Sequence, residues 1–158
     1  MTKTLIISSL LSILPISELR GAIPYAYFNG INLFASFAFC VLCNCLVAPI
    51  GFVFLNTAHK ALDKWSFYHK LFEKTVAKAR VRVGEKVEKY GLWGLMVFVA
   101  VPLPITGAWT GTIGAWILGL NKKKSTLSIC LGVLIAGIVV SSIIYAGVGI
   151  NSIFIKQV

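Results

Sequence analysis

Hydrophobic residues along this chain gather in runs of two different lengths. Two runs, residues 31–56 and 125–150, are long enough to cross a membrane, because a helix needs roughly 20 residues to span a hydrocarbon core of about 30 Å. The second run is dotted with glycine and serine, which let helices approach one another closely. The two runs predict full transmembrane helices, and the small residues of the second predict an interface within the chain or in a homodimer.

Two pairs of shorter apolar runs have a different design. Residues 4–14 and 22–28 form one pair, and residues 91–101 and 108–120 form the other, with a proline-containing turn inside each pair. Proline lacks a backbone N–H and ends or bends a helix, and one short run cannot cross the core. Each pair therefore predicts a broken, re-entrant helical hairpin, and the chain as a whole predicts an all-α polytopic membrane protein.

A polar stretch, residues 57–90, separates the two halves. Its apolar residues recur mostly every three or four positions, which is the period of an amphipathic helix. Lysine and arginine occupy much of the remainder. We expect a cytoplasmic helix or helix pair that lies along the membrane surface or packs under the transmembrane bundle.

The order of these elements repeats: broken hairpin, full span, linker, broken hairpin, full span. This order predicts one membrane domain over residues 1–158, with a first repeat of about 1–56, a linker of about 57–90 and a second repeat of about 91–158. A Gly-x-Asn sequence follows each hairpin, the first beginning at Gly30 and the second at Gly119. This echo supports an internal repeat.

Charge predicts how the two repeats lie in the membrane. Nine of the fifteen basic residues fall in the linker, and Lys122, Lys123 and Lys124 form a second cluster beside the last span. Basic residues next to spans favour the cytoplasmic side. With both clusters inside, and each hairpin returning to the side from which it came, the two repeats are inverted, as in many secondary transporters.

The composition favours a membrane protein over a soluble one. Hydrophobic residues make up 58% of the chain, charged residues 13%, and the formal net charge is +10; soluble domains average about 25% charged residues. A basic surface beside a membrane meets anionic lipid headgroups first. We therefore expect membrane lipids as partners and no nucleic acid.

Several other chemistries find no support in the sequence. Lys3 and the apolar run behind it resemble the start of a signal peptide, but no A-x-A cleavage site follows, so we expect the segment to be retained. The four cysteines lie in apolar runs without ligand spacing for a metal. No nucleophile elbow, phosphate loop or carboxylate pair is present, and we expect no enzyme activity and no cofactor.

The turn of the first hairpin carries unexpected charges. Glu18 and Arg20 are the only charged residues between Lys3 and Lys60, and an ionisable group at membrane depth indicates function. If residues 15–24 are locally unwound, the two can pair; otherwise positions two apart on a helix point away from each other. Arg20 suits a phosphate or carboxylate, and a desolvated Glu18 suits a proton carrier. An exposed ion pair in an external loop is the alternative.

Further candidate binding residues carry no charge. Pro24 lies close behind the first tip, and Asn44 lies near the centre of the first full span, where it either joins the substrate path or makes an interhelical hydrogen bond. The turn of the second hairpin offers hydroxyls, an indole and backbone N–H groups, which suit an anion at the start of a half-helix. Its candidate residues are Pro102, Pro104, Thr106, Gly107, Trp109 and Thr110.

These two turns resemble a known family. Residues 16–24, Ile-Ser-Glu-Leu-Arg-Gly-Ala-Ile-Pro, and residues 102–111, Pro-Leu-Pro-Ile-Thr-Gly-Ala-Trp-Thr-Gly, resemble the bacterial and archaeal small multidrug export protein family. The resemblance implies drug export from a prokaryotic cell (inner) membrane. That family is in turn similar to the DedA/VTT superfamily, whose members have paired re-entrant hairpins and are implicated in moving lipids such as undecaprenyl phosphate. This chain departs from that superfamily in lacking an arginine in its second hairpin.

Three functions follow from these observations. The first is a proton-linked transporter of an amphipathic or anionic small molecule or lipid headgroup, with its site between the two hairpin tips. The second is a DedA-like lipid flippase or scramblase. The third is a membrane assembly protein that transports nothing, in which the broken helices serve packing and Glu18 and Arg20 form a structural bridge.

Overall fold

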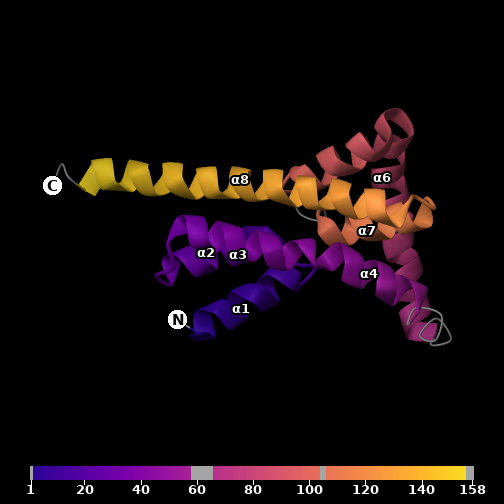
Figure 1. The fold of residues 1–158 in the computed structure, drawn as a ribbon, viewed down its shortest axis with the longest axis horizontal. Helices are drawn as coiled ribbons and strands as arrows, with labels where there is room; N and C mark the ends of the chain where they lie inside the picture. Colours follow the sequence, from indigo (N-terminus) through magenta and orange to yellow (C-terminus); the bar gives the residue numbers. More distant parts are fainter. Residues whose placement is uncertain (1, 58–65, 104–105, 156–158) are drawn as a thin grey trace.

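The computed structural model describes residues 2–57, 66–103 and 106–155. Every regular element in these ranges is a helix, which confirms the predicted all-α class (Figure 1). The helices are α1 (Thr2–Ile13), α2 (Glu18–Phe28), α3 (Leu33–Cys45), α4 (Val47–Asn56), α6 (Ser66–Ala100), α7 (Ala108–Ile117) and α8 (Lys122–Ile155).

Two helical stretches are long and apolar enough to cross a membrane. One is Leu33–Asn56, made of α3 and α4, with 24 residues and a mean hydropathy of 2.4; the other is Lys122–Val148 of α8, with 27 residues and a mean hydropathy of 2.6. They coincide with the two predicted full spans. In Figure 1 they run side by side in opposite directions.

The interruption between α3 and α4 has a chemical cause. Pro49 lacks the N–H that would bond to the carbonyl four residues earlier, on Cys45. The thiol of Cys130 on α8 donates to that carbonyl instead, at 3.8 Å. This hydrogen bond links the interruption between α3 and α4 to α8.

The shorter helices form two hairpins that point at each other. In Figure 1, α1 and α2 lie together at one end of the molecule with their connection near its middle. The last part of α6 and α7 approach from the opposite end, and their connection also lies near the middle. A kink at Gly91 (φ 58°) separates this last part of α6 from the rest, at the residue where the sequence predicts a short apolar run to begin.

The two Gly-x-Asn sequences fold identically at the level of hydrogen bonds. Gly30 (φ 89°) and Gly119 (φ 65°) are left-handed. In each turn the residue after the glycine donates its N–H to the carbonyl five residues earlier, at 3.1 Å and 3.0 Å, which is the Schellman ending of a helix. The side chains of Asn32 and Asn121 then cap α3 and α8 by accepting an N–H three residues on, at 2.7 Å and 3.2 Å.

The amphipathic part of α6 packs against α7. Val83 is fully buried, and a Cβ added at Gly114 would lie 2.7 Å from a methyl group of Val83. The rings of Phe72 and Trp116 meet edge to face with centroids 6.3 Å apart. The sequence left two arrangements open for this helix, along the membrane surface or packed under the bundle. The contacts with α7 favour packing under the bundle.

The small residues of α8 serve contacts within the chain. A Cβ added at Gly132 would lie 2.6 Å from the carbonyl oxygen of Met96 on α6, and one added at Gly137 would lie 2.8 Å from Val41 on α3. These glycines therefore allow α8 to approach both halves of the molecule.

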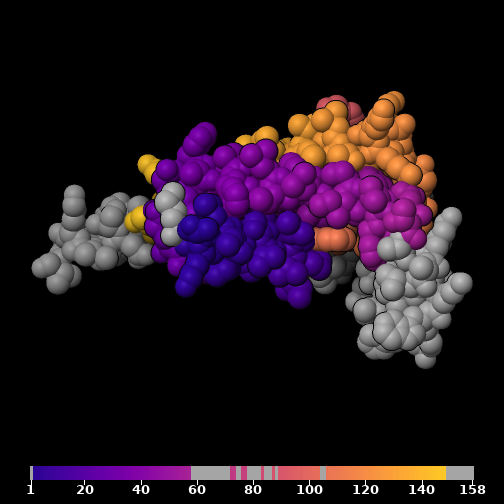
Figure 2. Space-filling view, turned by 60° about the horizontal axis from the view of Figure 1, so that its bottom comes forward, coloured from indigo at the N-terminus to yellow at the C-terminus, as the bar shows by residue number. Residues whose placement is uncertain are grey.

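The outer surface of the described helices is strongly apolar. Figure 2 shows α1, α3 and α4 packed side by side over one face, and large hydrophobic side chains point outward from them and from α8. Such a surface suits lipid and would be a liability in water. Residues more than half exposed include Ile6, Leu10, Phe34, Leu42, Val53, Leu127 and Ile143.

Candidate functional site

The two hairpin tips meet at Glu18. This residue begins α2, and its side chain is only 7% exposed. Its carboxylate accepts the backbone N–H of Ala108 at 3.3 Å and that of Trp109 at 3.4 Å. Both donors belong to the first turn of α7, where N–H groups lack helical partners and the helix dipole is positive. A negative side chain from one half thus occupies the helix start of the other.

Gly107 makes room for this contact. A Cβ added there would overlap the carboxylate of Glu18 and lie 2.5 Å from its Cδ. The backbone of Gly107 is extended (φ 162°), a conformation open to any residue. Glycine is therefore needed here for its lack of a side chain.

The end of α1 is held by side chains from both halves. Its last carbonyl groups have no helical partner, because the chain turns at Pro15. The carbonyl of Ser12 accepts the side-chain N–H of Asn44 at 2.5 Å, and that of Ile13 accepts the indole N–H of Trp109 at 2.6 Å. Asn44 therefore makes the interhelical hydrogen bond expected from the sequence, and Trp109 links the tips a second time.

Replacing Trp109 by phenylalanine is expected to destabilise the protein by about 1–2 kcal/mol, because the carbonyl of Ile13 loses its donor in a partly buried position. Thermal unfolding in detergent would measure this. Trp93→Phe is the matched control, since Trp93 is 70% exposed. An equal loss in both variants would contradict a specific role for the indole N–H.

A small cavity adjoins Glu18, with room for roughly one water molecule. It brings together five of the candidate residues predicted from the sequence, from both tips and from the last turn of α3. Helices α2, α6 and α8 supply the apolar remainder. Its described lining residues are Glu18, Leu19, Arg20, Asn44, Val99, Pro102, Thr106, Val133, Ala136 and Val140.

Two polar groups on this cavity have unused bonding capacity. Within the described part of the chain, the guanidinium of Arg20 makes no hydrogen bond and no ion pair, with Glu18 included. Asn44 is fully buried, and its Oδ1 has no hydrogen-bond partner among the described residues. Buried polar atoms are nearly always paired, so the cavity has acceptor and donor groups available for an occupant.

The backbone at Glu18 is strained. Its φ of 46° lies in the left-handed region, which costs a non-glycine residue of order 1–2 kcal/mol. The strain accompanies a tight connection: only residues 14–17 separate α1 from α2. Strained residues cluster at functional sites.

The local geometry of the first tip differs from one sequence expectation. Unwinding over residues 15–24 was the condition for pairing Glu18 with Arg20, but α2 already begins at Glu18 and contains Pro24. A proline in the second turn of a helix removes only one hydrogen bond, here to the carbonyl of Arg20, so the helix continues. Glu18 accordingly turns to α7 and leaves Arg20 unpaired among the described residues.

The remaining candidate binding residues differ in where the structure places them. The hydroxyl of Thr106 lies within hydrogen-bonding distance of the carbonyls of Val101 (2.7 Å) and Leu103 (2.9 Å), so it holds the second tip together. Pro24 and Thr110 are half-buried and do not line the cavity. Pro104 lies outside the described residues.

The sequence reading missed the apolar wall of the site. Val133, Ala136 and Val140 on α8 line the cavity, and their spacing of three and four places them on one helix face. That period was available in the sequence, but in a helix that is hydrophobic all round it does not stand out. Backbone N–H groups at this helix start were expected to suit an anion, but the sequence did not identify Glu18 of the other tip as their acceptor.

The site combines an acidic side chain, a basic side chain and the N-terminus of a helix. Burial disfavours a charged carboxylate, whereas N–H donors favour it, so Glu18 is placed between two opposing influences. Arg20 offers a fork suited to an oxyanion. Among the described residues no group of three histidine, cysteine, aspartate or glutamate side chains is placed to hold a metal ion.

Comparison with known proteins gives one match. The sequence profile of the small multi-drug export protein family matches residues 18–139, which is 122 of the 158 residues and includes Glu18, Arg20 and the whole second tip. Comparisons with curated proteins and with solved structures gave no match. A match over more than three quarters of the chain is decisive, and the chain belongs to the small multi-drug export protein family.

Proposed function

We propose that this protein is a proton-linked membrane transporter that moves an amphipathic or anionic small molecule or a lipid headgroup between its two hairpin tips. One observation carries the proposal: the buried carboxylate of Glu18 bridges the two halves of the chain through the N–H groups of Ala108 and Trp109, beside Arg20, whose guanidinium forms no hydrogen bond or ion pair with the described residues. Membership of an export family agrees with it.

The depth of the site supports transport. Asn44 lines the cavity and is the twelfth of the 24 residues in the span Leu33–Asn56, counting from 33 to 44. If this span crosses the bilayer, the cavity lies near the midplane. Helices α1 and α7 have 12 and 10 residues, about 18 Å and 15 Å in length, which suits re-entrant hairpins that approach the midplane from opposite sides.

The arrangement of the two halves also fits a transporter. Each hairpin ends in a Schellman turn and an asparagine cap that starts the following long helix, and the hairpins enter from opposite ends (Figure 1). These features support an inverted repeat. Broken helices that meet near the midplane are the usual setting of substrate and ion sites in secondary transporters.

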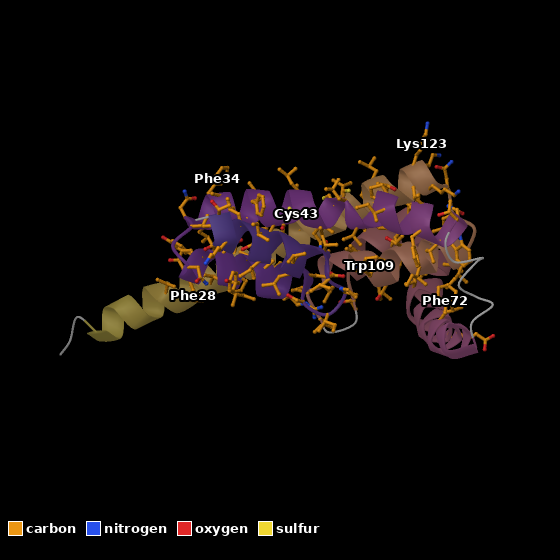
Figure 3. All side chains as sticks on the ribbon, turned by 90° about the horizontal axis from the view of Figure 1, so that it is seen from below. Phe28, Phe34, Cys43, Phe72, Trp109 and Lys123 are labelled. Carbon is orange, nitrogen blue, oxygen red and sulfur yellow. The ribbon has the colours of Figure 1, made fainter. Side chains whose placement is uncertain are left out.

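The positions of the basic residues support one orientation of the protein in the membrane. Figure 3 labels Lys123 and Phe72 at one end of the molecule, Phe28 and Phe34 at the other, and Trp109 between them. Phe72 belongs to α6, whose sequence is rich in lysine and arginine, and Lys123 belongs to the second basic cluster. The positive-inside rule makes that end cytoplasmic.

The test is transport by the purified protein in lipid vesicles, with and without a pH gradient. Fluorescent amphipathic anions and a fluorescent phospholipid are the probes. Faster movement of an anion when a pH gradient is imposed, absent from protein-free vesicles, is the expected result. Lipid movement independent of the gradient would overturn proton linkage in favour of a flippase, and movement of neither probe type would favour the assembly protein.

A further inference from the structure

We infer that the first turn of α7 is a binding site for a carboxylate of the transported molecule, and that the Glu18 carboxylate occupies this site in the present state. Only the statement that the bound molecule is transported rests on the proposed function. The site itself stands on the geometry of Glu18, Gly107 and the N–H groups of Ala108 and Trp109.

The start of α7 is shaped for a carboxylate. Two successive backbone N–H groups each bond one of the two oxygens of Glu18, which is how a planar carboxylate lies on a helix start. Gly107 leaves the space that a Cβ would fill. The two hydrogen bonds, at 3.3 Å and 3.4 Å, are longer than the roughly 2.7–2.9 Å of strong charge-assisted contacts.

Two groups beside the site have bonding capacity that no described residue uses. Asn44 is fully buried with a free Oδ1, and the guanidinium of Arg20 is unpaired among the described residues. Glu18 satisfies neither. A ligand that carries a carboxylate and a neighbouring hydroxyl or N–H group would supply an anion for Arg20 and a donor for Asn44, and we assign the substrate class accordingly.

The two carboxylates exclude each other. The cavity holds roughly one water molecule, so a ligand can enter only when the Glu18 side chain leaves. Protonation of Glu18 removes the charge that binds it to the helix start. Glu18 and Arg20 are the only acidic or basic groups among the described residues that line the cavity; α3, α6, α7 and α8 contribute none. Proton binding to Glu18 and ligand entry are therefore coupled.

Chemical rescue tests this inference. Glu18→Ala in the full-length, detergent-solubilised protein empties the site, and sodium formate is the probe. Formate is expected to raise the thermal midpoint of this variant saturably, by about 3–6 °C at roughly ten times its dissociation constant. Wild type, whose site is filled, and Glu18→Ala/Gly107→Ala, whose site contains the added methyl group, should not respond. Sodium chloride at equal ionic strength controls for salt.

A second variant protects the test against failure to fold. Glu18→Gly empties the same space and relieves the left-handed backbone at this position, and it should respond to formate as the alanine variant does. Absence of a saturable response in both single variants, or an equal response in all proteins, would overturn the inference. A response to inorganic phosphate and not to formate would overturn the assignment to carboxylates. Because these measurements need no transport, rescue without transport would refute only the proposed function.

Discussion

In the Glu18→Gln variant, we expect the rate of transport in a pH gradient to fall to the rate measured without a gradient. Glutamine has nearly the same size as glutamate but its amide does not titrate, so any proton coupling through Glu18 is lost. Its amide also accepts less strongly than a carboxylate from Ala108 and Trp109, which should cost about 1–2 kcal/mol of stability. Vesicle uptake measured over a range of pH, together with thermal unfolding, separates the two effects.

Glu73→Gln is a suitable control for this variant. Glu73 lies on the exposed surface of α6, outside the cavity, and its replacement should leave the pH dependence of transport unchanged. If Glu18→Gln keeps both the rate and the pH dependence of wild type, Glu18 is not the proton carrier.

Gly107→Ala should have the largest effect on stability among single changes at the tips. The new methyl group would occupy the space of the Glu18 carboxylate, and the buried acid would lose its place at the helix start. Overpacking of this kind costs roughly 1–3 kcal/mol, and loss of the charge-assisted hydrogen bonds adds to it. We expect a lower thermal midpoint and no gradient-driven transport.

A double-mutant cycle isolates the cause. In a Glu18→Ala background the same glycine substitution meets no carboxylate, so most of its cost should disappear. The interaction energy between positions 18 and 107 should then be of order 1–3 kcal/mol, as found for residues in direct contact. Additive effects of the two substitutions would show that Gly107 acts on the fold in some other way.

Much of the architecture was predictable because membrane proteins obey strict length rules. The runs at 31–56 and 125–150 match the two long apolar stretches of the structure, and the Gly-x-Asn sequences at both hairpin ends mark matching turns. Helix length and turn chemistry are local properties, so the sequence carries them directly.

The contacts of the site were less predictable, because they join distant parts of the chain. Glu18 and Arg20 stood out as charges in an apolar region, but the sequence predicted that they pair with each other only if residues 15–24 are locally unwound. The structure extends α2 across Pro24 and turns Glu18 toward Ala108, 90 residues away. The sequence predicted free N–H groups at the start of this half-helix, but a pairing across 90 residues depends on the tertiary fold, so it did not identify Glu18 as their acceptor.

The two sides of this contact tolerate mutation very differently. One tip contributes a carboxylate that only a second acidic residue could imitate, while the other contributes main-chain groups that survive any side-chain change that preserves the helix start. A substitution at Ala108 leaves the N–H donor in place but disturbs a fully buried side chain, whereas Gly107 is constrained by the absence of a side chain. At this contact, deep mutational scanning should show a sensitive acid at position 18 and a sensitive glycine at position 107, while the N–H donors themselves are kept in every variant that preserves the helix start.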